Sequence, residues 1–125
     1  MTYKILVLLS MIFCHIVDDY YLQGILASMK QKQWWTQNAP DKMYEYDYLV
    51  ALFMHSFSWA FMIMLVPTLY VILFGGILNP VLFLGNILVH MVVDDAKANK
   101  REISLIQDQC IHLLQILWTW YCMMF

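Results

Sequence analysis

Charged side chains are scarce in this 125-residue chain, where Asp, Glu, Lys and Arg make up 13% of the residues and apolar types make up 62%. An average soluble domain carries about 25% charged residues. A soluble fold of this length could not hide so much apolar surface. The net charge of -2 is too small to indicate nucleic acid or another strongly charged partner. The composition therefore predicts a protein of the lipid bilayer.

Cysteine is nearly absent as well. Cys14, Cys110 and Cys122 are odd in number, form no CxxC pair and lie in apolar stretches, so we expect neither a disulfide nor a zinc-thiolate site. The amino-terminal apolar run also lacks small residues ahead of Cys14, where a signal peptidase would need them. We therefore interpret this run as the first helix.

No Asp, Glu, Lys or Arg occurs from residue 49 to 93, a stretch about twice too long for one membrane crossing. It must form two helices. Pro67 could mark the turn, but Gly75 suits a helix end, and Asn79 followed by Pro80 suits a helix start, so we place the turn there and expect a kink at Pro67. Ser104 and Gln107 form a capping box for the last helix. The sequence predicts a single all-α transmembrane domain, an antiparallel bundle of four transmembrane helices at about residues 2–32, 48–74, 80–97 and 104–125.

Basic residues indicate the orientation of this bundle. The side opposite the first and third loops has only Lys4. The loops themselves hold Lys30, Lys32, Lys42, Lys97, Lys100 and Arg101. Because cytoplasmic loops are enriched in Lys and Arg, we expect both termini outside the cytoplasm of a bacterial inner membrane.

Each expected helix carries one histidine: His15, His55, His90 and His112. Ionisable groups at the centre of a membrane helix cost about 2.5 to 3.5 kcal/mol on insertion scales, so they persist where they pair or line a polar cavity. Depth counted from the loops puts the histidines at similar levels. They are predicted to converge.

Carboxylates accompany three of these histidines at a spacing of i, i+4, which puts both side chains on one helix face. Mixed imidazole and carboxylate ligands without thiolate suit Zn²⁺, Mn²⁺ or Fe²⁺, and we expect one or two ions. The candidate ligands are His15, Asp19, His55, His90, Asp94, Asp108 and His112. The alternative is a hydrogen-bond network that only fastens the helices, at about 0.6 kcal/mol per bond.

Further polar residues continue these faces. The candidates for substrate binding are Gln23, Lys97 and Gln115. Asp18 and Asp95 should point about 100° away from their neighbours, which makes each a second-layer residue or a catalytic base.

Several motifs together resemble a family of bacterial and phage membrane proteins catalogued as domain of unknown function 3307. They are His15 with Asp18, Asp19 and Gln23, then Lys30 with Trp34, His55 with Ser56, His90 with Asp94 and Lys97, and Asp108 with Gln109 and His112. The resemblance covers nearly the whole chain and implies a multi-helix membrane protein of no established activity. More loosely, the pattern resembles small inner-membrane proteins described as metal-dependent hydrolases.

Three functions are consistent with this sequence. The first is a membrane-embedded metal-dependent hydrolase acting on a lipid or other amphiphilic substrate from the cytoplasmic side. The second is transport of protons or metal ions, which with four helices would require a homo-oligomer. The third is a non-enzymatic phage-type accessory protein that binds a host membrane protein. Apolar outer halves of the helices favour the enzyme.

Overall fold

The computed structural model describes residues 2–125, which are helical and contain no strand. Four long helices make up most of this part of the chain, and shorter helical segments connect the first two. The elements in order are α1 (Thr2–Val17), η1 (Asp18–Leu22), α2 (Leu26–Met29), α3 (Lys32–Asn38), η2 (Lys42–Tyr44), α4 (Asp47–Leu73), α5 (Pro80–Asp95), η3 (Ala96–Lys100) and α6 (Leu105–Met124). The prediction of an all-α fold is confirmed.

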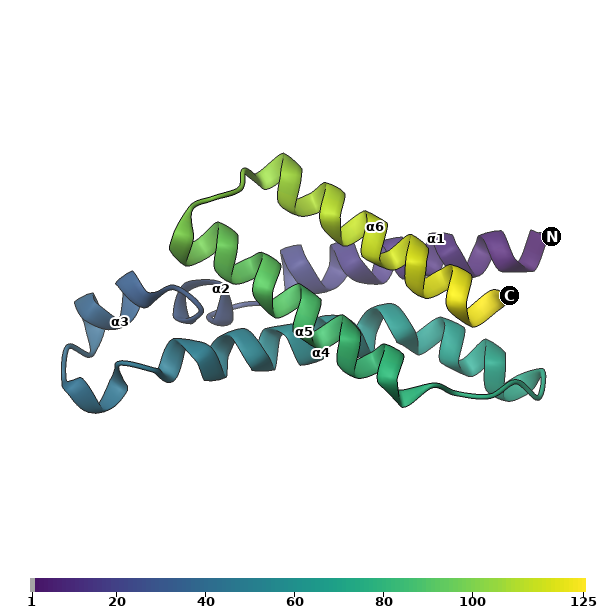
Figure 1. Ribbon diagram of the computed structural model, residues 1–125, viewed down its shortest axis with the longest axis horizontal. Helices are drawn as coiled ribbons and strands as arrows, with labels where there is room; N and C mark the ends of the chain where they lie inside the picture. The colour runs from purple at the N-terminus through teal and green to yellow at the C-terminus, as the bar shows by residue number, and fades with distance from the viewer. Residues whose placement is uncertain (1) are drawn as a thin grey trace.

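The four long helices α1, α4, α5 and α6 alternate in direction, and α4 packs against the other three (Figure 1). The two ends of the chain lie at one end of the molecule, and α2 and α3 lie at the other. The Trp120 indole donates a hydrogen bond to the carbonyl oxygen of Lys4 at 2.7 Å, and the Lys4 ammonium donates to the carbonyl of Met124 at 2.5 Å. These two bonds hold the start of α1 against the end of α6.

The ends of the last three long helices lie within about two residues of the predicted positions. After α4, Gly75 has φ of +73°, a left-handed conformation that favours glycine at a helix end. The Asn79 side chain accepts a hydrogen bond from the Val81 amide at 3.0 Å, and Pro80 is the first residue of α5. The predicted capping box of Ser104 and Gln107 starts α6. Pro67 lies inside α4.

The predicted end of the first helix at residue 32 is wrong. The regular helix ends at Val17, continues as one π-helical stretch to Leu22, and then breaks at Gly24, whose φ is +51°. Glycine tolerates this left-handed conformation, which other residues rarely adopt. The chain therefore turns, and Leu26–Met29 forms a separate short helix that packs against α4.

The outer surface of the bundle is largely apolar, with side chains such as Ile77 (94% exposed) and Leu73 (78% exposed) on it. Two helical segments, Tyr3–Leu22 and Lys42–Leu73, are long and apolar enough to cross a membrane. The helix α6 is also 20 residues long but carries Asp108, His112 and three glutamines, which lower its hydropathy. Four crossings thus remain a proposal.

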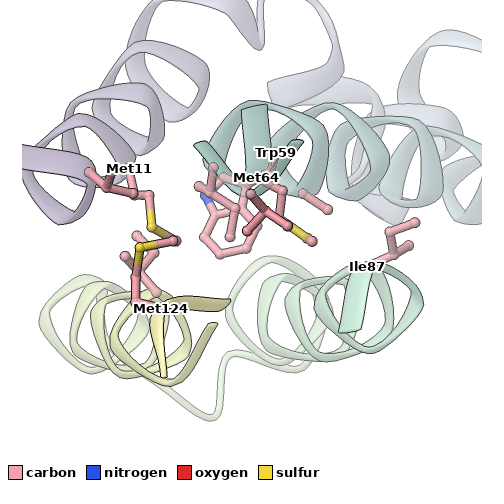
Figure 2. Close-up of a cluster of buried hydrophobic side chains, with 10 residues drawn as sticks. Met11, Trp59, Met64, Ile87 and Met124 are labelled. Carbon is pink, nitrogen blue, oxygen red and sulfur yellow. The ribbon is translucent and has the colours of Figure 1, made fainter. Parts of the chain in front are cut away.

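Between the long helices, one cluster of buried apolar side chains fills the half of the bundle near the termini. It includes Val7 and Met11 from α1, Ile63 from α4, and Ile116 and Met124 from α6. Met11, Trp59, Met64, Ile87 and Met124 point toward one another in Figure 2. The polar cluster described next begins on the other side of Trp59.

Candidate metal centre

The four histidines converge, as predicted, in the interior of the bundle. His90 lies at the centre, with its ring centroid 4.2 Å from that of His112 and 5.1 Å from that of His55. His15 is 5.8 Å from His112. Each of the four is at most 2% exposed. The indole ring of Trp59 stacks on His90 at 4.2 Å and closes the cluster toward the apolar core.

Ligand-type atoms from all four long helices point into this cluster. Nε2 of His55 lies 3.1 Å from Nε2 of His90, 3.3 Å from an oxygen of Asp94 and 3.4 Å from an oxygen of Asp19. Nε2 of His112 lies 3.4 Å from Asp94 and 3.3 Å from Asp108. Two groups of side chains could hold a metal ion: Asp19, His55 and His90, and His90, Asp94 and His112. They share His90.

These separations fit a metal centre. Ligands placed about 2.0 to 2.1 Å from a tetrahedral ion are separated from one another by about 3.3 Å. The observed separations of 3.1 to 3.8 Å bracket that value. Nε2 of His112 and Oδ1 of Asp108 are both buried and lie 3.3 Å apart, but neither has a contact with the geometry of a hydrogen bond within residues 2–125. Buried polar atoms normally have partners, so an ion would satisfy these atoms.

Two lysines balance part of the negative charge. The Lys30 ammonium lies 2.5 Å from Oδ2 of Asp94, and the Lys97 ammonium lies 2.6 Å from Oδ2 of Asp108. With Asp18 and Asp19 the cluster has four carboxylates, and two ammonium groups leave a formal charge of -2 when the imidazoles are neutral. An uncompensated charge is costly in an apolar interior. One divalent cation would neutralise the cluster.

Sequence reasoning missed the role of Lys30. Only 7% exposed, it follows α2, whose turn brings it back over the end of the bundle toward Asp94. In the sequence, Lys30 lies beside a predicted loop, and it indicated only which side of the membrane that loop faces. Its position in the resemblance to domain of unknown function 3307 was the one available signal.

Asp18 lies in the second layer, one of the two places predicted for it, but it does not point away from its neighbour Asp19 as predicted. Asp18 and Asp19 begin the π-helical stretch η1, and its wider turn lets two consecutive aspartates face the interior. Asp18 is 1% exposed, and its Oδ1 accepts a hydrogen bond from the Ser58 hydroxyl at 2.6 Å. Its Oδ2 lies 3.7 Å from Nδ1 of His55. Asp18 therefore lies behind His55, on the side of the ring opposite Nε2, at a separation longer than a hydrogen bond.

His15 is placed differently from the other histidines. Its Nδ1 accepts a hydrogen bond from the Trp59 indole at 2.8 Å, which leaves Nε2 to donate to the side-chain oxygen of Gln109 at 3.1 Å. With both ring nitrogens bound, His15 lies outside the two candidate groups. The amide nitrogen of Gln109 donates hydrogen bonds to Asp108 at 3.0 Å and to Asp19 at 3.4 Å. Gln109 therefore connects His15 to the carboxylates.

The other predicted site residues lie at the edges of the cluster or beyond it. Asp95 accepts a hydrogen bond from Asn99 at 2.8 Å and lies 3.5 Å from Lys100, away from the histidines. Gln23 donates to the backbone oxygen of Asp19 at 2.5 Å. Lys97 binds Asp108, as described above.

Gln115 does not reach the histidines. Its amide donates to the backbone and side-chain oxygens of Asn86, at 2.8 and 2.9 Å. The hydroxyl of Thr119 donates to the same Asn86 side chain at 3.0 Å. These three residues fasten α5 to α6 between the histidine cluster and the termini.

The fold and the site thus define a class: an all-helical protein with a buried cluster of histidines and aspartates that could hold a metal ion. Comparison of the chain with protein-family models, curated proteins and solved structures gives no match. The resemblance to domain of unknown function 3307 stays an expectation.

Proposed function

We propose that this protein is a membrane-embedded metal-dependent hydrolase that acts on a lipid or other amphiphilic substrate from the cytoplasmic side. One observation carries the proposal. Imidazole nitrogens and carboxylate oxygens from four helices approach to within 3.1 to 3.8 Å in a buried cluster, whose formal charge is -2 when the imidazoles are neutral. A fastening network would not need six ligand-type side chains in one buried cluster, whereas a metal centre would use them. Zn²⁺, Mn²⁺ and Fe²⁺ suit this donor set.

The proposed setting is a bacterial inner membrane crossed by all four long helices. The apolar exterior and the two segments long enough to cross support it. The cluster lies in the half of the bundle near the basic residues 30–42 and 97–101, which the positive-inside rule assigns to the cytoplasm. The two termini, which lie together at the other end, would then face outward (Figure 1).

Each residue of the centre has a role in this proposal. His55, His90 and His112 would hold the ion with Asp19 and Asp94. Asp18 would orient His55, and Lys30 would fix the carboxylate of Asp94. When bound, a divalent ion supplies Lewis acidity, which activates water and polarises the scissile group. The rings of Trp59 and His90 stack on the apolar side and exclude water from that direction.

Transport is less consistent with the interior of the bundle. A polar path does extend from the histidines to Asn86 and Thr119, but it ends there. Beyond it the core is filled by apolar side chains, among them Met11 and Met124 (Figure 2). An ion crossing the membrane needs polar groups along its whole path. A polar cluster confined to one half of the bundle suits an enzyme better than a transporter.

Two matched double variants test the proposal. The variant K30M/D94N removes the buried pair and one candidate ligand together, whereas K100M/D95N removes the neighbouring pair outside the cluster. Protein purified in mild detergent should retain about one divalent ion per chain, measured by elemental analysis. We expect K30M/D94N to lose this ion and K100M/D95N to keep it.

Activity is measured on the same samples with ester and phosphoester lipids as substrates. Hydrolysis by the wild-type protein should stop when the ion is chelated and return when Zn²⁺, Mn²⁺ or Fe²⁺ is added back. Wild-type protein that binds no divalent ion after refilling would contradict the metal site. Protein that binds the ion and hydrolyses none of these lipids would contradict the hydrolase.

A further inference from the structure

A groove runs along the outside of the bundle between α1 and α6 and reaches the cluster. Its volume is about 500 Å³, within the range of about 300 to 1,000 Å³ typical of ligand pockets. Ile12 and Ile16 of α1, Tyr20 and Tyr21 of η1, and Leu113 of α6 line it. The lining surface is almost wholly apolar, and it is spread over two turns of α1 and one of α6. This shape suits a hydrocarbon chain.

Two polar residues also line the groove, of which His15 is buried and Gln109 is half-buried. His15 and Gln109 belong to its lining, and the Gln109 amide binds Asp108 and Asp19 of the cluster at 3.0 and 3.4 Å. A molecule lying in the groove is thus separated from the candidate ligands by one side chain. Four other cavities of the described part of the chain have no histidine or aspartate of the cluster in their lining.

Positive charge lies next to the same point. The Lys97 ammonium and the Gln109 amide bind the same oxygen, Oδ2 of Asp108, at 2.6 and 3.0 Å. The side chain of Lys97 is 31% exposed and that of Lys100 is 53% exposed. Arg101 follows directly and is exposed. Lys100 faces Asp95 and Arg101 donates to Gln33, so Lys97 is the cation placed next to Gln109 to receive a phosphate. At the proposed cytoplasmic surface, anionic lipids attract lysine.

We propose that the groove binds one hydrocarbon chain of an anionic phospholipid, with the phosphate next to Lys97 and the bonds between chain and phosphate facing Gln109. This inference rests on the proposed function, for which it names the substrate class and the face from which the substrate reaches the centre. The apolar walls, the polar residues His15 and Gln109, and the Lys97 ammonium next to Gln109 each match one part of such a lipid.

The test uses native mass spectrometry of the whole protein, released from detergent that contains equal amounts of phosphatidylglycerol and phosphatidylcholine with identical chains. The wild-type protein should retain one phosphatidylglycerol in preference to phosphatidylcholine. The variant L113W fills the groove and should lose this lipid. The control L114W changes the next residue of α6, which is 65% exposed and does not line the groove, and should retain it.

A photoreactive group in the lipid chain gives a second measurement, which does not depend on the folding of a variant. On the wild-type protein it should crosslink to α1 and α6, at residues 12, 16 and 113. The inference is overturned if the wild-type protein retains the two lipids equally, or if L113W retains as much phosphatidylglycerol as the wild-type protein. It is also overturned if the crosslinks are spread over α4 and α5.

Metal content measured on the same samples separates this inference from the proposed function. Loss of the lipid from L113W with the ion retained supports the groove. Wild-type protein that retains phosphatidylglycerol but binds no ion contradicts the metal centre and leaves the lipid site standing.

Discussion

The buried pair of Lys30 and Asp94 gives a sharp prediction, because the next residue, Asp95, forms an exposed pair with Lys100 that serves as a control. Lys30 is 7% exposed and Asp94 is 2% exposed, and their charged atoms are 2.5 Å apart. Removing one partner of a buried pair leaves the other charge uncompensated, at a cost of about 3 to 5 kcal/mol. The variant K30M should therefore lower the free energy of unfolding of the metal-free protein by that amount.

The control is K100M. Lys100 lies 3.5 Å from Asp95, but its side chain is 53% exposed, and exposed pairs contribute about 0 to 1 kcal/mol. Both variants remove one lysine that faces an aspartate at the same end of α5. The difference between them therefore measures burial, with charge number and residue type held constant.

The assay is reversible unfolding in mixed micelles of mild detergent and sodium dodecyl sulfate, followed by circular dichroism with and without Zn²⁺. Without the Lys30 ammonium, the formal charge of the cluster changes from -2 to -3. A bound cation therefore offsets more repulsion between the carboxylates in K30M than in the wild-type protein. Because a ligand that binds only the folded state stabilises it, Zn²⁺ should restore more stability to K30M than it adds to the wild-type protein. If K30M and K100M unfold alike, with or without the ion, our account of the charge balance is refuted.

Three further predictions concern single residues and orientation. His55→Ala should abolish stoichiometric metal binding, as measured by elemental analysis. His15→Ala should leave the ion in place, because both ring nitrogens of His15 are bound within the protein. Equal loss of the ion in both variants would place His15 among the ligands. Trp59→Phe should lower the free energy of unfolding by about 1 to 3 kcal/mol, since Nδ1 of His15 loses its donor, and no change on denaturation would contradict that bond. A topology reporter fused after Phe125 should be active outside the cytoplasm and one within residues 33–47 inside it, and the opposite pattern would invert the site.

Much of the fold followed from local patterns in the sequence. The uncharged stretch from residue 49 to 93 and the breakers Gly75 and Pro80 determine where α4 and α5 lie, because helix ends depend on neighbouring residues. Ser104 and Gln107 likewise determine the start of α6. Convergence of the histidines could be predicted because their depths, counted from the loops, agree along helices of alternating direction.

Only the tertiary structure decided which side chains do what. The wider turn of η1 lets Asp18 face the interior together with Asp19, whereas spacing on a regular helix predicted about 100° between the two side chains. The break at Gly24 returns Lys30 to Asp94 from a separate short helix, a contact between residues 64 positions apart. His15 and His55 look alike in the sequence, but the Trp59 indole and the Gln109 amide bind only the first. Such differences depend on packing between helices, and local sequence carries no record of it.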